Sequence, residues 1–194
     1  MVLLAKNYAK SRFRSNVGLK RRLSSYRWQL ARNSIDWYQP TEKNNNYVFH
    51  ASSLYHIQAN GEKANLLRSE FIRAAKSFSN FEGGLVSDLA NPNLDQYKDV
   101  AILKGYSQAE YANKTKQSSI VFNTPAAWGC LGWKLGEYLA FGSAIISMPL
   151  ERQLPSPLNH KEHIYFVKDV GSIRCAVQEL VSDETLRKRL QKNS

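Results

Sequence analysis

SIVFNTPAAWGCLGWKLGEYLAFGSAIISMPL, residues 119–150, holds the clearest secondary-structure pattern in the chain. Residues 119–122 are a short apolar run, which predicts a buried strand. Residues 123–132 contain a proline and two glycines and therefore predict a loop. Residues 133–141 predict a helix, because they end at a glycine that suits a helix terminus. Residues 144–148 predict a second strand, so the segment is a strand, loop, helix and strand in succession.

The rest of the chain from residue 47 onward repeats this alternation. Apolar runs predict further strands at 47–52, 81–86 and 163–167. Amphipathic or capped stretches predict helices at 62–78, 94–104, 107–116, 171–180 and 183–191. We therefore expect an α/β fold with a single Rossmann-like parallel sheet flanked by helices over residues 47–194. Residues 1–46 are expected to be a basic, partly helical arm or linker.

The net charge of +11 is concentrated at the amino terminus. Residues 1–35 carry nine of the 27 basic residues and none of the 16 acidic ones. Three interpretations stay open for this segment: a solvated arm or remnant of a preceding domain, a transit peptide, or residues 1–34 resting on an anionic membrane surface. The near balance of charge in the remainder argues against nucleic acid as a partner.

Other composition signals exclude several classes of protein. The two cysteines form no CxxC and no His pair accompanies them, so we expect no metal site and a reducing, cytoplasmic location. No window approaches 18 consecutive apolar residues, so no membrane-spanning helix is expected. No P-loop, GxGxxG or Ser-His-Asp pattern is present.

Candidate ligand contacts lie in and after the loop at 123–132. In open parallel sheets, ligands bind beyond the carboxyl ends of the strands. Gly129 and Gly132 permit close backbone approach, and the following helix offers free N–H groups to a phosphate. Lys134 could add a positive charge there, and Glu137 could accept from both hydroxyls of a ribose. This arrangement is typical of a site for a nucleoside diphosphate.

The same residues carry a family resemblance. Residues 135–142 (LGEYLAFG), followed by SAIIS at 143–147, resemble the donor-binding segment of group-1 glycosyltransferases of the GT-B type. HIYFV at 163–167 and LVSDETLRKRLQ at 180–191 resemble the closing segment of that family. The resemblance implies the carboxyl-terminal half of a GT-B enzyme, which binds a nucleotide-diphospho-sugar donor without a cofactor or metal. It also implies an N-terminal acceptor domain or partner chain, without which transfer would be incomplete.

By this resemblance, Glu137 corresponds to the second glutamate of the family's paired motif, which binds the donor ribose. The first glutamate of the pair would stand at position 129, which is glycine here. The basic residues that usually follow the first strand are also not evident, and Lys63 is the one candidate. The complete set of donor-site candidates is Glu137, Lys134, Gly132, Gly129, Trp133 and His56.

Each candidate also has a structural interpretation. Glu137 and Lys134 could be exposed helix residues, Trp133 could belong to the core, and His56 or His50 could serve packing alone. The chain as a whole has two alternatives: a degenerate α/β interaction module, or a nucleic-acid-binding protein that acts through its arm.

Overall fold

The structure is a computed structural model, and it describes residues 34–43, 46–56, 61–125 and 131–194. The chain divides after Trp37 into two units. Of the first unit, the structure describes a 3-10 turn, Ile35–Trp37, and the basic arm at 1–33 lies outside the described residues. Within the described parts of the chain, no helix is both long and apolar enough to cross a membrane.

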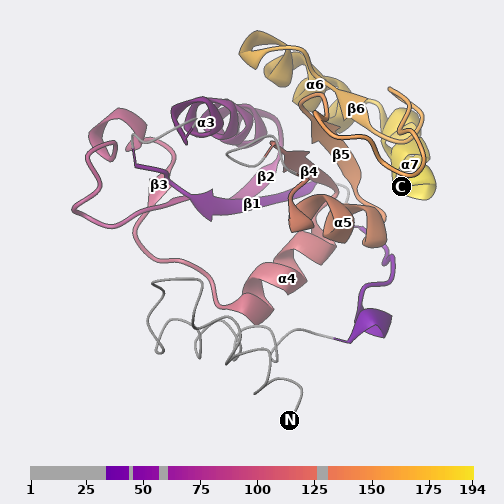
Figure 1. The fold of residues 1–194 in the computed structure, drawn as a ribbon, viewed down its shortest axis with the longest axis horizontal. Coiled ribbons are helices and arrows are strands. Elements are labelled where there is room, and N and C mark those ends of the chain that lie inside the picture. Colours follow the sequence, from indigo (N-terminus) through magenta and orange to yellow (C-terminus); the bar gives the residue numbers. More distant parts are fainter. Residues whose placement is uncertain (1–33, 44–45, 57–60, 126–130) are drawn as a thin grey trace, which may run out of the picture. The chain divides into compact units, whose positions relative to one another are not determined.

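In the described residues of the second unit, 38–194, six parallel strands form two groups of three (Figure 1). The first group, in spatial order, is β1 (Tyr47–Ser53), β2 (Asn80–Val86) and β3 (Ala101–Ile102). The second group is β4 (Ile120–Asn123), β5 (Ala144–Ser147) and β6 (Tyr165–Phe166). The expected α/β class with parallel strands is therefore confirmed.

Strands β1 and β4 lie side by side and join the two groups at their amino ends. The Ser119 N–H donates to the Tyr47 carbonyl at 2.9 Å, and the Phe49 N–H donates to the Ser118 hydroxyl at 2.9 Å. Beyond these bonds the two strands form no ladder, so the expected single sheet is two three-stranded sheets that meet edge to edge. The spatial order is 3-2-1-4-5-6, which places the topological switch point between β1 and β4.

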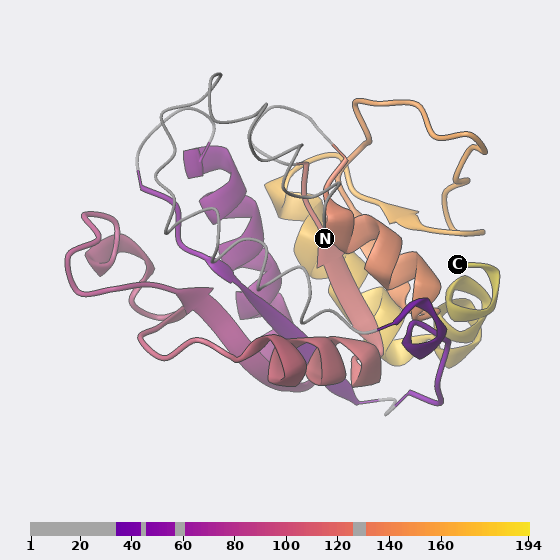
Figure 2. The same cartoon turned by 60° about the horizontal axis from the view of Figure 1, so that its bottom comes forward.

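Helices cover both faces of these strands (Figures 1 and 2). Helices α3 (Gly61–Phe78) and α6 (Val170–Ser182) pack on one face, and α4 (Gln108–Gln117) and α5 (Trp133–Ala140) pack on the other. The last helix, α7 (Glu184–Asn193), packs against α6 and β5.

Alternation along β4 builds the core on both of these faces. Ile120 and Phe122 face the α3 and α6 side, where the Phe122 ring stacks on Phe71 with centroids 4.9 Å apart. Val121 faces the other side and packs with Leu135 of α5. A strand buried on both faces reads as a continuous apolar run, which explains why β4 was predictable from the sequence.

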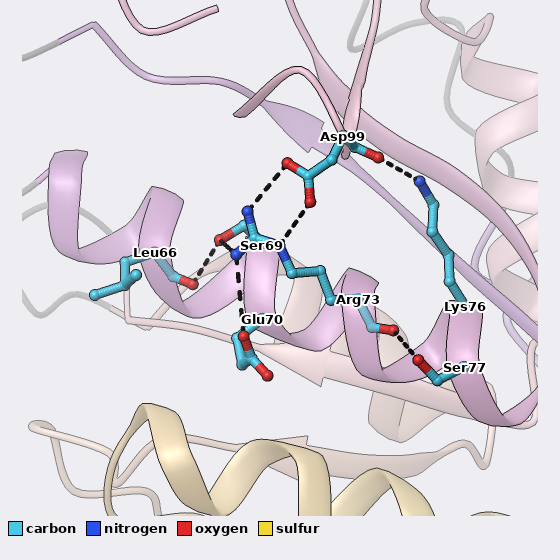
Figure 3. A network of polar contacts seen from close by, with 7 residues as sticks. All are labelled: Leu66, Ser69, Glu70, Arg73, Lys76, Ser77 and Asp99. Carbon is cyan, nitrogen blue, oxygen red and sulfur yellow. Dashed lines mark hydrogen bonds and ion pairs between the residues drawn. The ribbon is translucent and has the colours of Figure 1, made fainter. Parts of the chain in front are cut away.

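An exposed polar network fixes α3 against the turn that precedes β3 (Figure 3). The Arg73 guanidinium donates to both carboxylate oxygens of Asp99, at 2.7 and 3.1 Å. The Lys76 ammonium donates to the Asp99 carbonyl at 2.7 Å. Hydrogen bonding to Arg73 lowers the pKa of Asp99 below its ordinary value. These contacts help to set the position of α3, which supplies a residue to the site described below.

Several local expectations are confirmed. Ser107 and Glu110 form the expected capping box of α4, in which each side chain accepts from the backbone N–H of the other residue. Gly142 ends the α5 segment with a φ of 61°. Gly83 has a φ of 118°, and a Cβ there would lie 2.1 Å from the His50 carbonyl oxygen. This approach explains the paired glycines of β2.

Two expectations about secondary structure are wrong. Residues 94–104 do not form a helix; they contain the 3-10 turn η2 (Asp95–Tyr97) and the short strand β3. The expected strand at 163–167 is reduced to β6, because residues 161–164 form a turn in which the Lys161 N–H donates to the Ile164 carbonyl at 2.8 Å.

Candidate functional site

The candidate site lies beyond the carboxyl ends of β1 and β4. Thr124 follows β4 directly, and α5 begins after Gly132. Gly132 provides no side-chain cap, and a Cβ placed there would meet nothing within 4 Å. The Leu135 N–H donates to the Gly132 carbonyl at 3.1 Å, and the amino end of the helix carries the positive end of the helix dipole, which favours a nearby anion. The crevice between Thr124, Gly132 and Leu150 is narrow, with a volume of about 10 Å³.

Arg68 of α3 reaches across β1 to this point. Its side chain is buried, its Nε donates to the Thr124 hydroxyl at 3.2 Å, and its guanidinium lies over the Tyr55 ring, 4.7 Å from the centroid. The Nη1 atom is buried and has no hydrogen-bond partner among the described residues. A buried guanidinium nitrogen without an acceptor is costly. Arg68 therefore presents unused donor capacity at the switch point.

The sequence analysis did not identify Arg68 and named Lys63 instead, which is exposed in the first turn of α3. A signal for Arg68 was present. Positions 64, 67, 71 and 75 are buried along one face of the helix, and position 68 falls on that face. A charged residue on an apolar helix face is unusual and points to a specific partner.

Lys134 lies inside the domain. Its Nζ donates to the Ala51 carbonyl at 3.0 Å and lies 5.1 Å from the Tyr111 ring centroid. The Ala51 carbonyl points toward β4, as that of Tyr47 does, because carbonyl direction has a period of two along a strand. The Lys134 ammonium therefore gives the Ala51 carbonyl a hydrogen-bond donor at a point where β4 no longer supplies one. Burial, and then the neighbouring Arg68, lower the pKa of Lys134 to about 7, while Glu137 opposes that effect.

His50 is buried beneath the same cations. Its ring packs edge-on against Phe71, with centroids 5.5 Å apart, and its Nε2 lies 3.2 Å from the Ser52 hydroxyl. Burial, with Lys134 and Arg68 nearby, holds the pKa of His50 well below its ordinary value. His50 is therefore neutral and serves packing, which agrees with its structural interpretation.

Glu137 is half-buried in the second turn of α5. Its Oε1 lies 3.4 Å from the Tyr38 hydroxyl, which can donate to it, and the Tyr38 ring stacks on Phe141 with centroids 5.4 Å apart. Glu137 also raises the pKa of Lys134, so the two side chains share one environment. The carboxylate is thus close to the cations, and Tyr38 contacts one of its oxygens.

The remaining candidates are more dispersed. Trp133 is 47% exposed at the start of α5, with its ring 6.4 Å from that of Tyr111. His56 is exposed, three residues after β1 ends. Gly129 lies outside the described residues. The structure therefore brings Glu137, Lys134, Trp133 and Gly132 together on α5.

The assembled site combines basic and acidic side chains. Arg68 comes from α3, Lys134 lies in the first turn of α5, and the acidic groups beside them are Glu137 of α5 and Glu151, which lines the crevice. Within the described ranges, no three His, Cys, Asp or Glu side chains gather as they would around a metal ion. Such a site can hold an anion and offer a carboxylate to a neighbouring hydroxyl.

Comparison with solved structures finds the same fold in glycosyltransferases. The C-terminal domain of a glycosyl transferase group 1 family protein, LpcC, from Francisella tularensis superposes with a TM-score of 0.52 at 15% identity, over 84% of this chain and 94% of that domain. A TarM variant from S. aureus, in complex with Fondaparinux, α-GlcNAc-glycerol and UDP, gives 0.56 at 11% identity, over 79% of this chain and 32% of that one. A glycosyltransferase from Rickettsia africae gives 0.52 at 14% identity, over 91% of this chain and 46% of that one.

No family model matches the sequence, and no curated protein is similar to it. The chain spans about a third of the TarM chain and under half of the Rickettsia protein. Structural likeness at these identities establishes the fold. The chain has the Rossmann-like fold of the carboxyl-terminal domain of GT-B glycosyltransferases, as the sequence resemblance implied.

Proposed function

We propose that this domain binds the nucleoside diphosphate of a nucleotide-sugar donor and serves as the donor half of a glycosyltransferase. One observation carries the proposal. The buried guanidinium of Arg68 and the half-buried Lys134 lie near the amino end of α5, at the topological switch point of a glycosyltransferase fold. Ligands of open α/β sheets bind at this position.

In the proposed complex, the diphosphate accepts from the unused nitrogen of Arg68 and lies at the positive end of the α5 dipole. A guanidinium suits a phosphate, because its donors match two phosphate oxygens at once. During transfer, these groups would stabilise the charge that develops on the leaving diphosphate. Positioned donors in a water-excluded site need no reorganisation as that charge appears.

Glu137 takes the ribose in this proposal. Its Oε1 now lies near the Tyr38 hydroxyl, so a ribose hydroxyl would replace Tyr38 as the donor to that oxygen. Lys134 has a structural bond to Ala51 and would act on the diphosphate through its charge, without direct contact. Trp133, exposed at the start of α5, is positioned to cover the bound nucleotide.

Transfer to an acceptor is a further part of the proposal, since this fold forms under half of the TarM and Rickettsia chains. The large apolar side chains that are exposed in the described parts of the domain support a covering partner. They occur in the first two turns of α3 or in segments that follow β2, β3 and β4, and are Leu66, Leu89, Leu103, Leu131 and Trp133. Their common position at the carboxyl ends of the strands is the position that a covering domain would occupy.

Calorimetric titration with UDP, GDP, ADP and inorganic pyrophosphate tests the donor site. We expect one nucleotide diphosphate to bind, and Glu137→Ala to weaken the nucleotides much more than pyrophosphate, because Glu137 is assigned to the ribose. Glu162→Ala, at an exposed turn before β6, is the matched control. Absence of binding by all four compounds at millimolar concentration would leave the fold without a donor site.

A further inference from the structure

A long loop joins β5 and β6 (Figure 2). Residues of this loop and the residues that follow β5 and β6 line a second hollow. Its volume is about 860 Å³, within the range of about 300–1,000 Å³ that is typical of ligand pockets. We call it the β5–β6 hollow, and its lining includes Pro149, Leu150, Leu154, Leu158 and Phe166. None of the described donor-site candidates lines it.

The lining of the β5–β6 hollow is mainly apolar, and its floor rests on the core. Leu150, Leu158 and Phe166 are partly buried and pack against the cluster around Ile145 and Ile164. The exposed parts of these side chains face the hollow. Binding of an apolar ligand to such a surface is favourable, because it removes the apolar side chains from water.

The charged residues that line the hollow are all basic. Arg152 and Lys168 are exposed, and neither forms an ion pair with a carboxylate in the described part of the chain. His160 is held otherwise: its Nδ1 accepts from the Phe166 N–H at 3.0 Å. Because Nδ1 accepts this hydrogen bond, it carries no proton, so the His160 ring is neutral and holds the backbone of Phe166. The charge of the hollow therefore comes from Arg152 and Lys168, and it complements an anion.

The loop over the hollow is held at its far end. Besides the bond to His160, the Asn159 N–H donates to His163 Nδ1 at 3.1 Å, and the Lys161 N–H donates to the Ile164 carbonyl at 2.8 Å. Prolines at 149, 155 and 157 restrict the intervening backbone further. These bonds fix the turn that ends the loop, and the prolines restrict the conformations of the loop itself.

We propose that the β5–β6 hollow binds the alkyl chain of a single amphiphile, whose anionic head group lies against Arg152 and Lys168. Leu150 lines both this hollow and the crevice at the end of β4. An amphiphile bound there would therefore lie beside the candidate donor site, as a lipid-linked acceptor would. The acceptor role rests on the proposed function, whereas binding of the amphiphile does not.

Titration of the full chain with octyl, decyl and dodecyl phosphate, each below its micelle concentration, tests this proposal. Burying one methylene tightens binding by up to about fourfold, so affinity should rise steeply with chain length at a stoichiometry of one. Dodecyltrimethylammonium should bind at least tenfold more weakly than dodecyl phosphate. Equal affinity for the two head groups, or no dependence on chain length, overturns the proposal.

Variants locate the site. Arg152→Glu and Lys168→Glu should each weaken dodecyl phosphate about tenfold, whereas Arg189→Glu, an exposed charge reversal on α7, should not. Leu154→Glu should abolish binding, whereas Leu89→Glu, on the 79%-exposed Leu89 after β2, should not. If Leu154→Glu unfolds the protein, the two charge reversals decide.

If the charge-reversal variants bind like wild type, the amphiphile binds elsewhere and the assignment is wrong. UDP binding, measured on the same samples, should be unchanged by dodecyl phosphate and by the Arg152 and Lys168 substitutions. Loss of the donor site and loss of the β5–β6 hollow are therefore distinguishable results.

Discussion

Replacement of Arg68 by methionine separates nucleotide binding from stability. In the unliganded domain, Arg68 contributes one hydrogen bond to Thr124 and a contact with the Tyr55 ring. Each is worth on the order of 1–2 kcal/mol. Two features of Arg68 are unfavourable: its Nη1 is buried without a partner, and its charge repels that of Lys134. Replacement by methionine removes both unfavourable contributions, which are of similar size to the favourable ones. Methionine fills most of the volume, so the free energy of unfolding should change by no more than about 1 kcal/mol.

Nucleotide binding should change far more. A charge-assisted hydrogen bond to phosphate is worth about 1.5–3 kcal/mol, so losing it weakens the nucleotide roughly 10- to 150-fold. The assay is calorimetric titration of UDP at low ionic strength, with the thermal midpoint of each variant measured in parallel. Lys63→Met, an exposed cation in the first turn of α3, is the matched control and should bind like wild type. Arg68→Lys keeps the charge and should give intermediate affinity.

Wild-type affinity in a folded Arg68→Met protein would refute this reasoning. So would equal losses in Arg68→Met and Lys63→Met, because the effect would then come from net charge and not from the site. If Arg68→Met unfolds, Arg68→Lys carries the test.

Three further predictions concern neighbouring residues. Tyr38→Phe removes the hydroxyl near Glu137 and should tighten nucleotide binding roughly two- to tenfold in calorimetry; weaker binding would make Tyr38 part of the site. Lys134 has a folded-state pKa of about 7, below the value in the unfolded chain. Between about pH 7 and pH 10 the unfolded chain therefore binds more protons than the folded one. The free energy of unfolding should rise over this range by up to about 1.4 kcal/mol per pH unit. Lys134→Met should remove this rise in urea titrations, and an unchanged slope would contradict the burial. Gly83→Ala places a Cβ 2.1 Å from a strand carbonyl and should prevent folding. At Gly136 a Cβ meets nothing within 4 Å, so Gly136→Ala should stabilise α5 by about 1 kcal/mol. Thermal melting compares the two variants, and similar midpoints would refute the close approach at Gly83.

The elements that could be predicted from sequence are those whose burial is complete. Strand β4 and strand β5 are buried along their whole length, so their apolar runs are unbroken. Strand β3 has two half-buried residues, and its neighbours resemble a helix in composition. Its pairing with β2 comes from tertiary contact, which local sequence does not encode.

The candidate site shows the same division. Glu137 and Lys134 were identifiable because they follow a predicted loop on one helix. Arg68 was not, because its role depends on how far its side chain reaches from α3 to Thr124, fifty-six residues later. The direction of Lys134 was also beyond the sequence. A long side chain at a helix start can turn outward to a ligand or inward, and the open carbonyl of Ala51 favours the inward position.

Amide chemical-shift mapping with UDP tests the central claim most directly. The account predicts that the largest shifts on titration fall at Thr124 and at residues 132–137, where the diphosphate and ribose are placed. Amides around the start of α7, residues 183–186, should stay unchanged as an internal reference. Shifts confined to other parts of the domain, or none at millimolar UDP, would contradict a donor site at the switch point between β1 and β4.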